Sequence, residues 1–126
     1  MDSPTGRLRV LIGEARRQPA INPPEGLDSE GPVRSVPDWV ARLYVLPVGP
    51  REWWLLCEPA PGRGDQAAGQ FVFAAAAGRY MVDTYDPGTG DCVARESAEG
   101  GPIVAGLACS GQAVFVHIRG LPRPPA

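Results

Sequence analysis

Glycine and proline interrupt this chain so often that long regular elements have little room to form. The 126 residues include 16 Gly and 15 Pro, about a quarter of the sequence. Proline fixes φ and lacks the N–H that continues a helix or central strand, and glycine supplies the positive φ of tight turns. These residues exclude a coiled coil, and no run of about 18 apolar residues is present to cross a membrane. Because 44% of the residues are hydrophobic, one domain with one modest core remains within reach.

Between Trp39 and Gly120, short apolar runs alternate with turn signals. Pairs such as Gly49-Pro50, Pro87-Gly88 and Gly100-Gly101 separate the runs, and such pairs are typical of hairpins and loops. This spacing predicts an all-β domain, an antiparallel β-sandwich of about seven strands. The predicted strands are 40–47, 51–58, 69–75, 79–86, 91–96, 102–108 and 112–119.

The first 38 residues differ from the rest. Residues 8–12 are apolar enough for one strand, but they can equally begin a short helix that continues to Arg17. From Gln18 to Pro37 the chain holds five prolines and few large apolar groups, which is typical of an extended linker. We therefore predict a proline-rich, partly ordered N-terminal arm over 1–38, the sandwich over 39–120 and a loose tail over 121–126.

Alternation with a period of two assigns the faces of the predicted strands. In the last of them, Val114, Val116 and Ile118 share one face, which we assign to the core. The same reasoning assigns further residues to the core: Leu43, Val45, Trp53, Leu55, Cys57, Tyr80, Val82 and Thr84. The opposite faces mix aromatic, aliphatic and charged groups, so we expect either a covering layer or a binding surface there.

Charge and cysteine content narrow the classes of partner. A net charge of −2 gives no electrostatic reason to bind nucleic acid or an anionic membrane. The cysteines Cys57, Cys92 and Cys109 match no zinc-site spacing, so we expect free thiols, with one disulfide and a leftover thiol as the alternative. Residues 1–4 do not resemble a signal peptide, so we expect a cytoplasmic location, or else removal of a leader.

The residues suited to catalysis are few. His117 is the single histidine, and no sequence motif places a nucleophile beside it, so we expect a surface or second-layer histidine. Asp83, Asp86 and Asp91 flank one turn, but their spacing is not that of an EF-hand and suits turn capping. We therefore predict neither a catalytic residue, nor a metal site, nor a cofactor.

Four aromatic residues are the strongest candidates for a ligand-binding surface: Tyr44, Trp54, Tyr85 and Phe115. The alternation places them on the second, mixed face of the sheet. Aromatic rings on a flat sheet stack against sugar rings and also anchor protein interfaces. Burial beneath a second layer or beneath residues 1–38 is the alternative to such a surface.

The stretch 78–91, GRYMVDTYDPGTGD, carries a family resemblance. Its form, a Gly-x-Tyr-x-Val strand followed by Tyr-Asp-Pro-x-Thr-Gly-Asp, resembles the C-terminal β-sandwich of many bacterial glycoside hydrolases, including modules labelled collagen-binding. Trp39, Trp53-Trp54 and the strand 113–118 extend the resemblance over about residues 36–119. The resemblance implies a sandwich fold and a non-catalytic role among carbohydrate-active proteins, although the catalytic barrel of those enzymes is absent here.

Together these observations predict a non-catalytic binding module. Through the resemblance, its partner would be a glycan or a carbohydrate-active enzyme. The alternative is a structural protein–protein interaction domain, oligomeric through an edge strand or docked on a partner protein. An enzymatic function is not expected, because acid–base residues are scarce.

Overall fold

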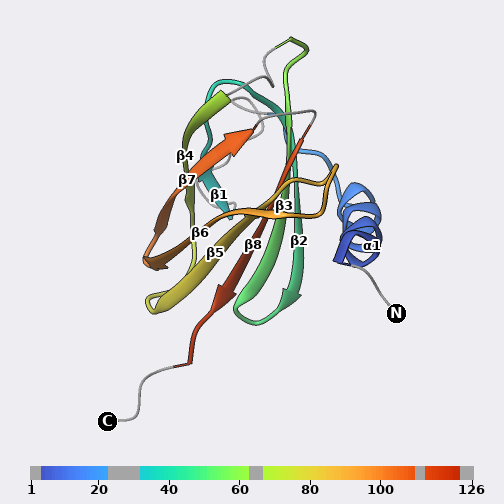
Figure 1. Ribbon diagram of the computed structural model, residues 1–126. Coiled ribbons are helices and arrows are strands. Elements are labelled where there is room, and N and C mark those ends of the chain that lie inside the picture. The colour runs from blue at the N-terminus through green and yellow to red at the C-terminus, as the bar shows by residue number, and fades with distance from the viewer. Residues whose placement is uncertain (1–3, 23–31, 63–66, 110–112, 123–126) are drawn as a thin grey trace.

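The computed structural model describes residues 4–22, 32–62, 67–109 and 113–122. Two antiparallel sheets face one another, and one helix lies against the outer face of the larger sheet (Figure 1). The helix is α1 (Pro4–Arg16). The strands are β1 (Val33–Ser35), β2 (Val40–Gly49), β3 (Glu52–Pro59), β4 (Ala67–Phe73), β5 (Arg79–Tyr85), β6 (Cys92–Glu99), β7 (Ile103–Cys109) and β8 (Val114–Gly120).

The predicted all-β architecture is confirmed. The seven predicted strands correspond to β2 through β8, with ends that differ by a few residues. The additional strand, β1, has three residues and lies between Pro32 and Pro37, where prolines indicated a linker. It pairs with β4, so tertiary pairing produces a strand that local sequence does not predict.

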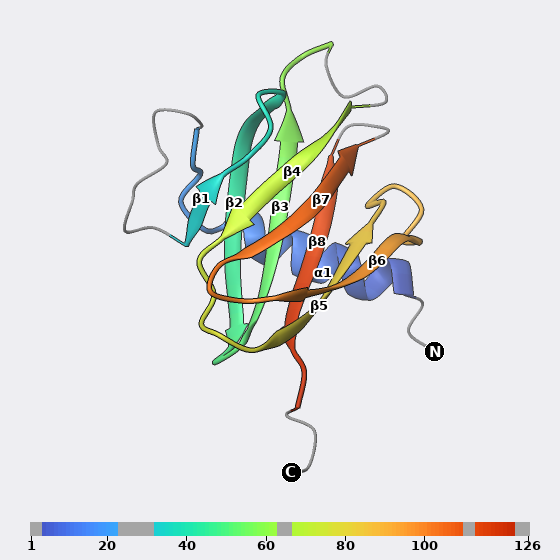
Figure 2. The ribbon, with the colours of Figure 1, turned by 90° about the vertical axis from the view of Figure 1, so that its left-hand side faces the viewer.

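The larger sheet has the strand order β2-β3-β8-β5-β6, and the smaller has the order β1-β4-β7. Figure 2 shows the smaller sheet in front of the larger one, with α1 behind both. Strand β8 lies between β3 and β5 and pairs antiparallel with each. It therefore joins the β2–β3 hairpin to the β5–β6 hairpin.

The main core lies between the two sheets, where the period-two alternation predicts it. Leu55, Val116 and Ile118 point inward from the larger sheet and are buried. Phe71, Phe73, Ile103 and Leu107 face them from the smaller sheet, and the ring of Trp53 lies 4.9 Å from that of Phe73. Burial of so many apolar side chains on both inner faces is the main stabilising contribution to the sandwich.

The sequence allowed either a strand or a helix at residues 8–12. In the structure these residues belong to α1. Leu8, Ile12 and Ala15 are buried against the sheet, and their spacing is that of one helix face. Both α1 and β1 fall within residues 1–38, the predicted arm, and both contact the sandwich. The remainder of the arm's proline-rich region, residues 23–31, and the tail from 123 onward lie outside the described residues.

Glycine substitutions test the helix and one close approach. In α1, a Cβ added at Gly13 would meet no atom within 4 Å, so Gly13→Ala is expected to raise the free energy of unfolding by about 0.5–1 kcal/mol.

At Gly100, an added Cβ would lie 2.6 Å from the Tyr80 ring and against the carbonyl of Ala76, so Gly100→Ala is expected to lower the free energy of unfolding. Urea unfolding measures both, and a loss of stability in Gly13→Ala would contradict the helix.

Candidate functional site

The outer face of the larger sheet carries the candidate site, and its register arranges the side chains in rows across the strands. One row runs Tyr44, Leu56, Phe115, Tyr85 from β2 to β5. The next row runs Leu46, Trp54, His117, Asp83, Arg95 from β2 to β6. The face therefore changes along the second row from apolar to polar.

The four predicted aromatic residues, Tyr44, Trp54, Tyr85 and Phe115, come together in one cluster, which we call the aromatic strip. Trp54 is at its centre, with its ring 4.6 Å from Phe115 and 5.7 Å from Tyr85. Leu8, Ile12 and Ala15 of α1 belong to the same cluster. The strip is thus the contact surface between the sheet and the helix.

Burial decides what the aromatic strip can do. Trp54 is 6% exposed and Phe115 is 0% exposed, Tyr44 is also buried, and Tyr85 is half-buried at the margin. Of the alternatives open at the sequence level, the structure shows coverage by a segment from residues 1–38. While α1 is in place, three of the four rings have no free face on which a sugar can stack.

An open groove lies beside the aromatic strip, between α1 and the turn that joins β5 to β6. It has a volume of about 560 Å³ and a floor that includes Ile12, Leu56 and Ala113. Its rim carries two guanidinium groups and two carboxylates. These belong to Arg9 and Arg16 of α1, Glu58 of β3 and Asp86 of the turn.

Two short-range interactions position groups at the rim of the groove. Arg16 Nη2 lies 3.5 Å from Glu58 Oε2, which joins α1 to β3 by an exposed ion pair. Asp86 Oδ1 accepts a hydrogen bond from the Gly88 N–H at 2.8 Å, as expected of an aspartate that begins a turn. The turn-capping role of Asp86 agrees with the prediction from the sequence. The groove was not predicted, because half of its rim comes from the predicted arm.

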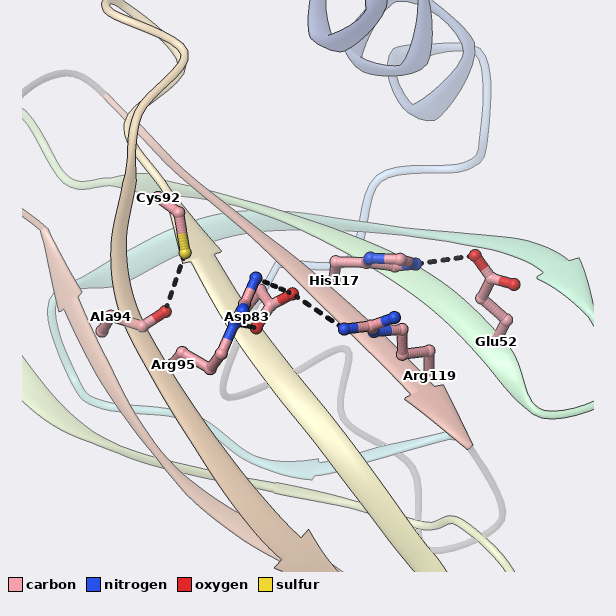
Figure 3. Close-up of polar contacts among 7 residues, drawn as sticks. All are labelled: Glu52, Asp83, Cys92, Ala94, Arg95, His117 and Arg119. Atoms are coloured by element: carbon pink, nitrogen blue, oxygen red, sulfur yellow. Dashed lines mark hydrogen bonds and ion pairs between the residues drawn. The ribbon is translucent and has the colours of Figure 1, made fainter. Parts of the chain in front are cut away.

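The uncovered part of the outer face carries a polar patch (Figure 3). The patch consists of Glu52, Asp83, Arg95, His117 and Arg119. His117 Nε2 lies 2.7 Å from Glu52 Oε2, and the imidazole stacks on the Trp54 indole with 4.0 Å between centroids and 5° between planes. His117 is therefore the link between the polar patch and the aromatic strip.

Asp83 is the buried charge of the polar patch. Its side chain is 3% exposed, and its Oδ1 accepts a hydrogen bond from Arg95 Nε at 2.8 Å. Arg119 Nη2 lies 3.9 Å from the other oxygen, Oδ2. The hydrogen bond between Arg95 and Asp83 is also the main cause of a raised pKa of the Arg95 guanidinium. A buried carboxylate is tolerated only when such partners replace its water.

The polar patch lacks the arrangement of an acyl-transfer site in the described part of the chain. The described contacts of His117 are a carboxylate and an indole, and neither is the hydroxyl or thiol nucleophile that such a site requires. Nor do His, Cys, Asp or Glu side chains in that part of the chain gather in threes to hold a metal ion.

The three cysteines form no disulfide, as the sequence predicts. Cys57 and Cys109 are buried, whereas Cys92 is exposed on β6, with its Sγ 3.3 Å from the Ala94 carbonyl oxygen. Burial raises the pKa of the Cys57 thiol to about 12. Because the thiolate is the reactive form, Cys57 is inert in the folded chain.

Comparisons with known proteins add no relative: no family model matches the chain, and neither the curated proteins nor the solved structures contain a significant match. The resemblance to accessory domains of glycoside hydrolases therefore stays a prediction. Within the described residues, no helix is both long and apolar enough to cross a membrane.

Thiol labelling tests the burial of the cysteines. In the native protein, a chromogenic disulfide reagent is expected to react rapidly with one thiol, that of Cys92, and with all three after unfolding. The matched variant Cys92→Ser should show no rapid phase. Rapid reaction of a second thiol in the native protein would contradict the burial of Cys57 and Cys109.

Substitution of Asp83 tests the polar patch. Asp83→Asn removes the negative charge that pairs with Arg95 and Arg119 and replaces one acceptor oxygen with an NH2 group that can only donate, so the free energy of unfolding should fall by about 1–3 kcal/mol. Asp91→Asn, at an exposed carboxylate in the nearby turn, serves as the control and should stay within about 0.5 kcal/mol of the parent. Equal effects in denaturant titrations would show that Asp83 is not a buried, paired charge.

Proposed function

We propose that this chain is a non-catalytic binding module that takes a carbohydrate in the groove between α1 and the β5–β6 turn. The observation that carries the proposal is the composition of the groove, an apolar floor with two guanidinium groups and two carboxylates at the rim. The resemblance of residues 36–119 to accessory domains of glycoside hydrolases supports the same ligand class.

The chemistry of the groove suits a sugar. Carboxylates accept hydrogen bonds from pairs of hydroxyl groups, and guanidinium groups donate several N–H bonds in a fixed plane. The C–H face of a sugar ring can pack on the apolar side chains of Pro87 and Ala113, which line the groove and are partly exposed. A volume of about 560 Å³ lies within the range of about 300–1,000 Å³ that small-molecule sites occupy.

The position of the carboxylates favours binding over catalysis. Glu58 faces Arg16, and Asp86 holds its own turn through Gly88. Glu58 thus has a guanidinium partner and Asp86 a backbone N–H partner, and each carboxylate keeps further acceptor capacity for hydroxyl groups. We therefore assign the groove to recognition and assign no step of bond cleavage to it.

The alternative, a protein–protein interaction domain that pairs through an edge strand, is supported by β6. Most residues of this edge strand are exposed. However, β6 itself carries Arg95, Glu96 and Glu99, and Glu96 Oε1 also accepts the N–H of Gly106 on the edge strand β7 at 2.9 Å, so both edges hold charged side chains. Charged side chains at an edge oppose pairing with another strand, which makes the groove the better supported site.

Titration of the native protein with a panel of soluble oligosaccharides tests the proposal. Calorimetry should detect binding of at least one member, and Arg16→Ala and Glu58→Gln should each weaken it about tenfold, the loss expected for one hydrogen bond to a charged group. Arg34→Ala removes an exposed arginine from β1 of the other sheet and should leave the affinity unchanged.

Two outcomes of that titration would overturn the proposal. One is the absence of any heat or chemical-shift change across neutral, acidic and amino-sugar oligosaccharides. The other is a binding signal that Arg16→Ala and Glu58→Gln leave as strong as Arg34→Ala does.

A further inference from the structure

The contact between α1 and the sheet is a self-contained unit. Leu8, Ile12 and Ala15 pack against the aromatic strip, and Arg16 forms an ion pair with Glu58. The first backbone anchor beyond the helix is the bridge between Ile21 and Leu43, with two N–H to carbonyl bonds of 2.9 Å. Residues 17–20 therefore form a short connection between two separate attachments.

The helix depends on the strip more than on its own sequence. It has 13 residues and no acidic residue in its first turn, it contains Gly13, and Val10 is 63% exposed. A helix of this length is marginal in water when isolated, and glycine and β-branched residues weaken it further. Without the helix, the aromatic strip would expose Trp54 and Phe115 to water. The helix and the aromatic strip therefore stabilise one another.

From this we infer that the aromatic strip also accepts α1 of a second copy of this chain, which gives a dimer with exchanged helices. A second copy presents the same three apolar side chains and the same arginine, so complementarity between helix and strip is already present. The Ile21–Leu43 bridge stays in place in both states, and the sheets need no rearrangement. This inference goes beyond the proposed carbohydrate site and stands independently of it.

The connection determines how readily the exchange occurs. Residues 17–20 span at most about 14 Å when extended, so the two sandwiches of the dimer must lie close together. Pro19 limits the conformations of the connection and keeps Gln18 from continuing the helix. A short linker gives an effective concentration on the order of millimolar for the closed monomer, so the dimer should become populated as the protein approaches that concentration.

Cross-linking of two different variants tests the exchange directly. One variant carries Arg16→Cys and the other Glu58→Cys, each with Cys92→Ser, so that the only accessible thiols lie on the helix of one and beside the strip of the other. After equimolar mixing, a short bis-maleimide should produce a covalent heterodimer on a denaturing gel. The yield should rise from micromolar to millimolar protein.

Two matched substitutions separate exchange from random collision. Leu8→Asp places a charge on the buried face of α1 and should undock the helix from its own strip and from that of a partner alike, which lowers the heterodimer yield to that of random collision. Val10→Asp, on the exposed face, should leave the yield unchanged. Sedimentation of the parent protein over the same concentrations gives a second measurement if Leu8→Asp does not fold.

The inference is overturned if the heterodimer stays at the level of the Leu8→Asp background at all concentrations, or if the parent protein sediments as a monomer up to the millimolar range. Loss of oligosaccharide binding has no bearing on this result, since the cross-link reports the position of α1 alone.

Discussion

The position of β8 is the constraint on which the other elements depend. It is the middle strand of the larger sheet, and its inward side chains Val114, Val116 and Ile118 are buried in the main core. On its other side, Phe115 is fully buried in the aromatic strip. A strand that is covered on both faces requires two layers around it, the smaller sheet on one side and α1 on the other.

The boundary of α1 on the sheet explains why one face carries two kinds of surface. Where the helix lies, the outward positions are aromatic or aliphatic, as at Trp54 and Phe115. Where it does not lie, they are ionisable and paired with one another, as at Asp83 and Arg95. His117 stands at the boundary, with its ring on Trp54 and its Nε2 beside Glu52. The groove occupies another part of this boundary, which is why it combines an apolar floor with a charged rim.

The seven longer strands and the inner faces were predictable because they follow from local patterns of alternation and turn residues. The helix was partly predictable, since Leu8, Ile12 and Ala15 have helical spacing, although the same segment begins like a strand. The candidate groove was not predictable from the sequence, because its rim brings Arg9 and Arg16 together with Glu58 and Asp86, which are far apart in the sequence. The partner of Asp83 likewise follows from the strand register, which turn residues constrain but do not determine.

The order in which the strands are synthesised has a consequence for the making of this protein. Strand β3 is complete at Pro59, but its neighbour β8 begins only at Val114. At about 5–20 residues per second, the ribosome leaves one backbone edge of β3 without its partner for several seconds. During that interval this edge is open to pairing with other strands, so the finished fold depends on β8 reaching β3 before a competing strand does.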